Sequence, residues 1–200
     1  MVMFYIIRGI VTVFMHIFFP FKVIGKENIC KGPCVVVSNH LSNADAFIVA
    51  MQFKGKTKVL TKRESFSSKP VSWFLRTLGG VPIDRDNPDA ATIIGLIKAL
   101  KNGERILIFP EGIRNKTNAP LLPIKGGAAL LALKGKVPVQ TIYIYGKSKL
   151  FKRNYIKIGE PFEFTEFYGA KVNAEVIQKA DETIRQKLLQ TREIPIKKGK

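Results

Sequence analysis

The sequence predicts a single α/β domain with a mostly parallel, mixed sheet flanked by helices, preceded by an N-terminal membrane-associated helix. Short apolar or β-branched segments alternate along the chain with segments of helical periodicity, which is typical of a sheet covered by helices. The first twenty residues are almost wholly apolar, whereas the 200-residue chain overall has an ordinary globular composition, 46% hydrophobic and 24% charged. This length is enough for one core but hardly for two.

The N-terminal segment, residues 1–21, is expected to be a helix that ends at Pro20. At 1.5 Å per residue it is long enough to cross the hydrocarbon of a bilayer. Its polar residues fall on one stripe of such a helix: Tyr5, Arg8, Thr12 and His16. Because a charged Arg8 at mid-bilayer would cost roughly 3 kcal/mol, we expect the helix to lie in one leaflet with this stripe toward headgroups or protein. A single true span and a buried core helix are the alternatives.

Residues 22–200 are expected to form the α/β domain, with strands where β-branched and apolar residues run together. These strands are predicted over 34–38, 58–60, 105–109, 138–145 and 155–158. The run at 105–109 is of the kind found in strands covered on both faces. Charged and apolar residues alternate over 155–158, which predicts a strand at a sheet edge.

Helices are expected between these strands, where apolar residues recur at helical spacing after capping residues. A helix over 44–52 is predicted to be capped by Ser42 or Asn43. The pair Asn87–Pro88 predicts the cap and first turn of a helix that ends at Gly103. The remaining helices are predicted over 70–78, 125–134 and 173–191.

The charge of the chain predicts an anionic partner. Lys and Arg number 33 against 15 Asp and Glu, which gives a formal net charge of +18 and a pI near 10.0. Such a surface suits nucleic acid, phospholipid headgroups, or a phosphorylated or acidic substrate. The apolar N-terminal segment favours a membrane phospholipid surface. Aromatic residues interleaved with basic ones, the usual signature of single-strand binders, are not evident, so we expect no nucleic acid partner.

Two cysteines, Cys30 and Cys34, are too few for a disulfide framework. Their C-x3-C spacing could begin a zinc site, but the chain has only two histidines. We therefore expect two reduced thiols at the start of a strand and no metal.

The first polar cluster, residues 38–45, lies between a predicted strand and a predicted helix. His40 follows the strand directly, and Asp45 falls in the first turn of the helix. On one helix their side chains would point about 140° apart, but across a strand-to-helix loop they can meet. A carboxylate bonded to one imidazole nitrogen fixes the tautomer and leaves the other nitrogen as a general base. On spacing alone, the alternative is a capping box with an incidental histidine.

Two further clusters, residues 79–85 and 109–115, each set a Gly/Pro turn beside a carboxylate and an arginine near an apolar strand. Arginine offers a fork of donors that matches a phosphate, and glycine lets the backbone approach it. Ligands of open α/β sheets gather outside the carboxyl ends of the strands. Taken singly, a pair such as Asp84–Arg85 or Glu111–Arg114 is more often a surface ion pair than a ligand site.

These clusters, in this order, resemble the blocks of the glycerophospholipid acyltransferases, most closely the bacterial enzymes that acylate lysophosphatidate. Residues 39–45 match the N-H-x4-D block and residues 80–85 the second block. Residues 109–114 match the third, with Ile113 in place of the more usual Thr. Residues 137–139 resemble the fourth, although Gln140–Thr141 departs from the second proline often seen there. The resemblance covers roughly residues 20–160.

The resemblance implies that a fatty acyl group passes from acyl carrier protein or CoA to the free hydroxyl of 1-acyl-glycerol-3-phosphate, giving phosphatidate. His40 is implied as the general base and Asp45 as the group that orients it, with direct attack on the thioester and no acyl-enzyme. The implied acceptor-binding residues are Arg85, Glu111, Gly112, Arg114 and Lys125. Motif residues with structural roles are Asn39, Ser42, Gly80, Pro82, Pro110 and Pro138. No metal or redox cofactor is required.

Lys22 and Lys26, just after the N-terminal helix, favour a peripheral or monotopic protein on the cytoplasmic face of the cell membrane. Two alternatives stay open. The chain could acylate glycerol-3-phosphate or another lysolipid, or it could be a non-catalytic basic membrane-binding module. The intact His40/Asp45 pair argues against the second.

Overall fold

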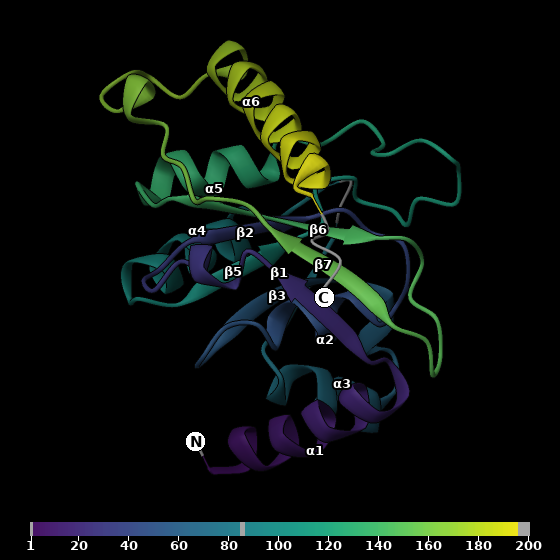
Figure 1. Ribbon diagram of the computed structural model, residues 1–200. Helices are drawn as coiled ribbons and strands as arrows, with labels where there is room; N and C mark the ends of the chain where they lie inside the picture. The colour runs from purple at the N-terminus through teal and green to yellow at the C-terminus, as the bar shows by residue number, and fades with distance from the viewer. Residues whose placement is uncertain (1, 85–86, 196–200) are drawn as a thin grey trace.

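The computed structural model describes residues 2–84 and 87–195 and contains one seven-stranded sheet between two layers of helices (Figure 1). The sheet order is β1-β7-β6-β2-β5-β3-β4. Every neighbouring pair is parallel except β6 and β7. The strands are β1 (Phe21–Ile24), β2 (Val35–Ser38), β3 (Thr57–Lys62), β4 (Gly80–Ile83), β5 (Arg105–Ile108), β6 (Val139–Tyr145) and β7 (Asn154–Ile158). The predicted α/β class with a mostly parallel, mixed sheet is confirmed.

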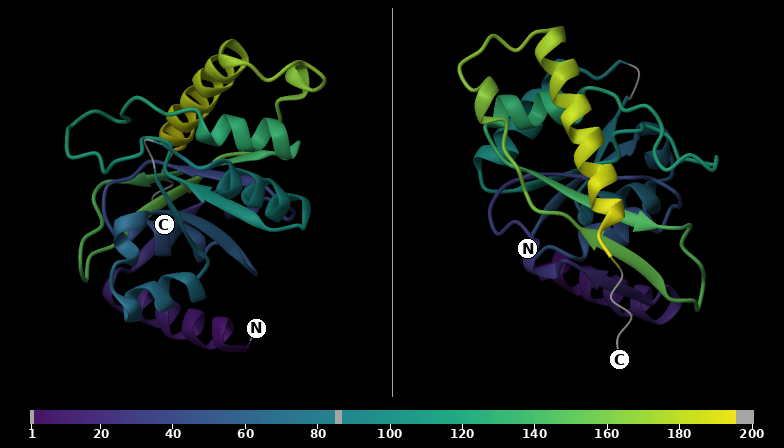
Figure 2. Two further views of the ribbon diagram at one scale, coloured as in Figure 1. Left: turned by 180° about the vertical axis from the view of Figure 1, so that it is seen from behind. Right: turned by 45° about the horizontal axis from the view of Figure 1, so that its top comes forward.

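Helices cover both faces of this sheet, as Figures 1 and 2 show from three directions. One layer consists of α4 (Ala90–Lys101), α5 (Gly127–Gly135) and α6 (Ala174–Glu193). The other consists of α1 (Val2–Phe18), α2 (Asp45–Ala50) and α3 (Lys69–Thr77). Short 3-10 turns are η1 (Lys26–Asn28), η2 (Arg63–Phe66) and η3 (Thr165–Phe167).

The central position of β2 in the sheet explains why its sequence is a continuous apolar run. Val35 and Val37 join the core beneath α4, α5 and α6, whereas Val36 joins the core on the side of α1 and α2. All three side chains are fully buried. Because successive side chains of a strand point to opposite faces, a strand covered on both faces must be apolar at every position.

The prediction that residues 155–158 form an edge strand is wrong, because β7 lies between β1 and β6. Its charged residue, Lys157, is only 4% exposed. The ammonium group donates to the carbonyl of Arg192 at the end of α6 and lies 4.8 Å from the centre of the Tyr145 ring. The alternating pattern implied that solvent would surround this ammonium group, but these two partners surround it instead.

The actual edges are β1 and β4, two short strands that the sequence did not distinguish from loops. Pro82 suits β4 because a proline has no N–H to donate and is tolerated in edge strands. β4 therefore places the second polar cluster at the edge of the sheet. Arg85, the last residue of that cluster, lies outside the described residues.

Two of the predicted helix caps are wrong. Ala44, not Ser42 or Asn43, occupies the cap position of α2 and makes no side-chain cap bond. Asp89, not Asn87, caps α4, because its carboxylate accepts from the backbone N–H of Thr92 at 2.7 Å. Asn173 caps α6 in the same way, at the predicted start of that helix.

Helix α1 packs against α2 and α3 and turns Arg8 toward the protein. The Arg8 guanidinium donates to the carbonyl oxygens of Phe53 and Gly55. The opposite side of the helix is exposed and apolar: Val2, Met3, Ile6, Ile10, Val13, Phe14 and Ile17. α1 is thus not a buried core helix. Within residues 2–84 and 87–195, no helix combines the length and the hydropathy that a membrane span requires.

We expect Gly79, between α3 and β4, to be far more sensitive to alanine than Gly103. Both glycines have left-handed φ values, +92° and +83°. A Cβ at Gly79 would lie 2.3 Å from the Thr57 carbonyl oxygen, whereas a Cβ at Gly103 would meet nothing within 4 Å. Gly103→Ala should cost about 1 kcal/mol of unfolding free energy, and Gly79→Ala at least about 2 kcal/mol more. Urea unfolding would measure both losses, and equal losses would contradict the steric argument.

Candidate active site

The turn that follows β2 brings His40 and Asp45 together. The chain leaves the sheet at Ser38 and enters α2 at Asp45. The His40 Nδ1 atom lies 3.1 Å from the Asp45 Oδ2 atom, and Asp45 is fully buried. A carboxylate oxygen accepts, so this partner assigns the proton to Nδ1 and leaves Nε2 as the basic nitrogen of the neutral ring. The strand-to-helix geometry expected from the sequence is present.

The Asp45 carboxylate is held by four further donors. Its Oδ2 atom accepts from the backbone N–H groups of Leu41 and Ser42, each at 2.6 Å. Its Oδ1 atom accepts from the hydroxyl of Ser42 at 2.6 Å and from that of Ser148 at 3.3 Å. The orientation of Asp45, and with it that of His40, is therefore fixed by the turn together with Ser148. Ser148 was missed in the sequence because it lies 103 residues from Asp45 and belongs to no motif.

Asn39 and Glu111 brace the turn from both sides. The Asn39 side chain donates to the Ile144 carbonyl and accepts from the Ile144 N–H, so it continues the pairing of β2 with β6 beyond Ser38. Glu111 accepts from the backbone N–H groups of His40 and Leu122, each at 2.8 Å. Glu111 is 3% exposed, and this burial raises the pKa of its carboxyl above the usual range. Direct contact of Glu111 with an acceptor stays a prediction.

The loop after β5 gathers the other residues of the third cluster. Gly112 has φ +71°, and the side chain of Lys125 lies over it, 3.4 Å from where a Cβ would stand. The Lys125 N–H donates to the Pro110 carbonyl at 2.8 Å. Lys125 and Arg114 are both exposed. The structure therefore brings Gly112 and Lys125 together on the loop that also carries Arg114.

Arg114 stands between two hollows. Its guanidinium donates to the Asn43 side-chain oxygen at 2.8 Å, and both residues line both hollows. The polar hollow, about 760 Å³, has further basic residues in its wall: Lys116, Lys147 and Arg192. Sequence reasoning missed these three, because they lie on separate elements and resemble ordinary surface charges.

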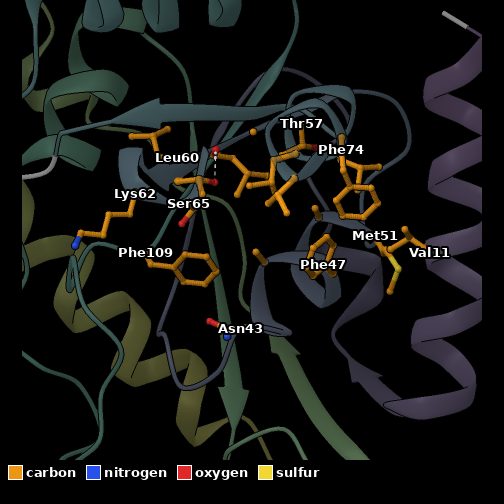
Figure 3. A pocket seen from close by; sticks show the side chains of 18 of the residues that line it. Val11, Asn43, Phe47, Met51, Thr57, Leu60, Lys62, Ser65, Phe74 and Phe109 are labelled. Atoms are coloured by element: carbon orange, nitrogen blue, oxygen red, sulfur yellow. Dashed lines mark hydrogen bonds between the residues drawn. The ribbon is translucent and has the colours of Figure 1, made fainter. Parts of the chain in front are cut away.

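The second hollow is an apolar cavity of about 630 Å³ between the sheet, α1, α2 and α3 (Figure 3). His40 and Phe109 belong to its wall, and their rings stack with centres 4.1 Å apart and planes 22° apart. Toward α1 the wall is formed by Val11, Phe47, Met51 and Phe74. Its volume lies in the usual range of ligand pockets, about 300–1,000 Å³. Apolar helix residues gave no signal for it, since core side chains have the same pattern.

The remaining motif residues have structural positions. A Cβ at Gly80 would lie 2.8 Å from the Leu75 carbonyl oxygen, so this site keeps α3 close to β4. The Pro138 carbonyl accepts from the Val35 N–H at the start of the β2–β6 pair. Cys30 and Cys34 are free cysteines. In the described part of the chain, no group of three or more His, Cys, Asp or Glu side chains is placed to hold a metal ion.

Comparisons with known proteins agree with this architecture. A family model described as Acyltransferase matches residues 20–145. A Bacillus subtilis 1-acyl-sn-glycerol-3-phosphate acyltransferase is 33% identical over 153 residues, which are 73% of this chain and 75% of that protein. A Saccharomyces cerevisiae protein of the same name is 32% identical over 67% of this chain. The alignment covers 46% of that protein, so the chain spans about half of its length.

The crystal structure of a 1-acyl-sn-glycerophosphate acyltransferase from Thermotoga maritima has a similar fold. The two structures superpose with a TM-score of 0.69, and the sequences are 25% identical. The match covers 95% of this chain and 80% of the Thermotoga chain. The similarity thus extends over almost the whole chain.

We expect Glu111 to stabilise the turn around His40. Glu111→Ala leaves the His40 and Leu122 N–H groups without their partner, which should lower the unfolding free energy by about 2–4 kcal/mol. Glu111→Gln retains one acceptor oxygen and should lower the unfolding free energy by about half as much. Glu175→Ala, which removes an exposed pair with Lys179, is the matched control and should cost less than about 0.5 kcal/mol. Urea unfolding measures all three, and an Ala variant as stable as the control would contradict the bracing role.

Proposed function

The chain belongs to the acyltransferase family, and we propose that it transfers a fatty acyl group from a thioester donor to the free hydroxyl of 1-acyl-glycerol-3-phosphate, giving phosphatidate. One observation carries this proposal: His40, paired with Asp45, lies at the wall of an apolar cavity, beside a hollow lined by basic side chains. A lipid acyl transfer needs a base, space for a hydrocarbon chain and a site for a phosphate. The names of the Bacillus and yeast relatives support the same reaction.

The proposed chemistry uses His40 as a general base. Its Nε2 atom takes the proton of the glycerol hydroxyl while the hydroxyl oxygen attacks the thioester carbonyl carbon. Asp45 stabilises the imidazolium that forms, as the acid of a serine-hydrolase triad does. When the tetrahedral intermediate collapses, the C–S bond breaks and the thiolate receives the proton from His40. The substrate hydroxyl takes the place of an enzyme nucleophile, so no acyl-enzyme forms.

We assign the acceptor phosphate to the basic side of this site. Arg114 offers a bidentate fork, and Lys125 lies on the same surface beside Gly112. Arg85 has the same proposed role. Glu111 acts here as a positioning residue for the His40 backbone. The donor is an acyl carrier protein or CoA thioester, both of which are anionic and suit a chain of net charge +18.

We also propose that the protein attaches to one leaflet of a membrane, on its cytoplasmic face. The support is the apolar outer side of α1 together with the basic net charge. With Arg8 bonded to protein carbonyls, its charge need not enter the lipid. An acceptor that resides in a bilayer would then reach the enzyme by lateral diffusion.

His40→Ala and Asp45→Asn should each lower turnover by about 10²–10⁴-fold or more while the fold is kept, because base and orienting group act as a unit. The assay uses purified protein in detergent, lysophosphatidate and a labelled acyl donor, with phosphatidate as the measured product. His16→Ala, which removes the other histidine of the chain, is the matched control and should leave turnover unchanged. A folded His40→Ala variant with near-normal turnover would exclude the mechanism. Product from glycerol-3-phosphate or another lysolipid instead would reassign the acceptor.

Arg114→Ala should lower kcat/KM for lysophosphatidate by about 10- to 100-fold. A charge-assisted arginine–phosphate contact contributes about 1.5–3 kcal/mol, and each 1.4 kcal/mol is a factor of ten. Arg114→Lys should recover only part of this, because a point charge cannot reproduce the fork. Activity on monoacylglycerol, which lacks the phosphate, should be low and change little in either variant. Equal losses on the two acceptors would mean that Arg114 acts on the fold or the reaction rather than on the phosphate.

A further inference from the structure

The turn between β6 and β7, residues 146–153, has an unusual composition for a surface loop. Its sequence is GKSKLFKR, with four basic residues, no acidic residue and two large apolar residues. Leu150 is 53% exposed and Phe151 is 63% exposed. The four basic residues, Lys147, Lys149, Lys152 and Arg153, are exposed as well. Exposed apolar side chains flanked by lysine and arginine are typical of segments that lie at an anionic lipid surface.

This turn is fastened in place. The Asn154 side-chain amide donates to the carbonyls of Pro20 and Lys152, and its oxygen accepts from the Lys149 N–H at 2.9 Å. Asn154 is buried, so these bonds hold the base of the turn against the chain that follows α1. Phe151 has φ +54°, a left-handed conformation that is uncommon for an aromatic residue. The apolar tip is therefore presented by a defined backbone.

The tip of the turn is continuous with the apolar outer side of α1. The Phe151 N–H donates to the Phe18 carbonyl at 2.7 Å, and the two rings lie 5.2 Å apart. Phe18 in turn stacks on Phe14 with ring centres 4.3 Å apart. Figures 1 and 2 show the green β6–β7 turn beside the C-terminal end of the purple α1. Phe151 thus extends the apolar surface of α1, and the exposed Leu150 stands next to it in the turn.

We propose that residues 146–153 form a second lipid-contact element, which inserts Leu150 and Phe151 into the headgroup region of an anionic phospholipid bilayer. Lys149, Lys152 and Arg153 bind the lipid phosphates around them. The inference rests on the proposed membrane attachment through α1 and adds a second site to it. An acidic carrier protein would also suit the charges, but exposed apolar residues continuous with the α1 surface favour lipid.

Lipid contact by this turn would also affect how the candidate active site is positioned relative to the bilayer. The same turn carries Ser148, whose hydroxyl donates to Asp45, and Lys147, which lines the polar hollow. A contact through the exposed side of α1 alone would leave the C-terminal end of the helix free to tilt away from the bilayer. A second contact beside that end would hold it down and so limit how the site is tilted relative to the bilayer.

Two variants test the proposal by vesicle flotation. Leu150→Ser combined with Phe151→Asn removes the apolar tip, and asparagine tolerates the positive φ. Lys152→Glu combined with Arg153→Glu reverses the charge. The matched controls lie in the opposite helical layer, on α4: Ile94→Ser, and Lys98→Glu combined with Lys101→Glu. The vesicles are phosphatidylcholine alone or with phosphatidylglycerol.

The apolar variant should bind both vesicle types about tenfold or more weakly, and the charge variant should lose about tenfold only on the anionic vesicles. The controls should bind as the unchanged protein does. Turnover of a dispersed short-chain lysophosphatidate in detergent should stay within about twofold for every variant, which also shows that the turn variants remain folded.

A third variant separates this proposal from the one it rests on. Ile6→Ser combined with Ile10→Ser tests attachment through α1. If only this variant loses vesicle binding, the lipid role of the turn is overturned while membrane attachment stands. If the unchanged protein itself does not float with vesicles, the membrane attachment is wrong, and the turn proposal falls with it. If the turn variants bind vesicles normally but lose turnover only with acyl carrier protein as donor, the turn is a carrier-protein site instead.

Discussion

The carboxylate of Asp45 is the interaction on which the site depends. It is fully buried at the first residue of α2, and its acceptor positions are filled by the backbone and hydroxyl of the turn that it closes. A buried carboxylate without such partners would be costly, so the turn has little freedom to adopt another shape. The remaining donors are the Ser148 hydroxyl and the His40 imidazole. The same group therefore orders the strand-to-helix connection and sets the tautomer of the histidine.

The order of the strands places residues from β5 and β6, and from the loops after them, next to the turn that carries His40. β2 lies between β5 and β6 and is parallel to both, so the loops after these three strands meet at the carboxyl end of the strands. From β5 comes Glu111, which binds the His40 N–H, and the Asn115 N–H, which donates to the His40 carbonyl at 2.7 Å. From β6 comes Ile144, which pairs with the Asn39 side chain. The backbone of His40 is thus held by neighbours that are far from it in sequence. Its ring is oriented by the hydrogen bond to Asp45 and by stacking on Phe109.

The sequence was informative wherever one local pattern determines the outcome. The central strands followed from continuous apolar runs. The placement of His40 and Asp45 across one turn allowed their contact, and the family resemblance implied it. Sequence reasoning failed where a residue's environment is made by distant parts of the chain. Lys157 indicated an edge strand, because nothing near it in sequence reveals the Arg192 carbonyl that receives its ammonium group. Ser148, Lys116 and the apolar cavity were missed for the same reason, since each is defined only when separate elements come together.

Arg8 determines how the N-terminal helix is rotated about its own axis. A helix that is apolar almost all round has no preferred rotation, because any side could be buried equally well. One arginine whose guanidinium must reach the carbonyls of Phe53 and Gly55 removes that freedom. With the rotation fixed, Phe4 and Val11 line the apolar cavity while Ile10, Val13 and Ile17 face outward. A single helix then separates the apolar cavity, whose wall contains His40, from the surface proposed to meet lipid.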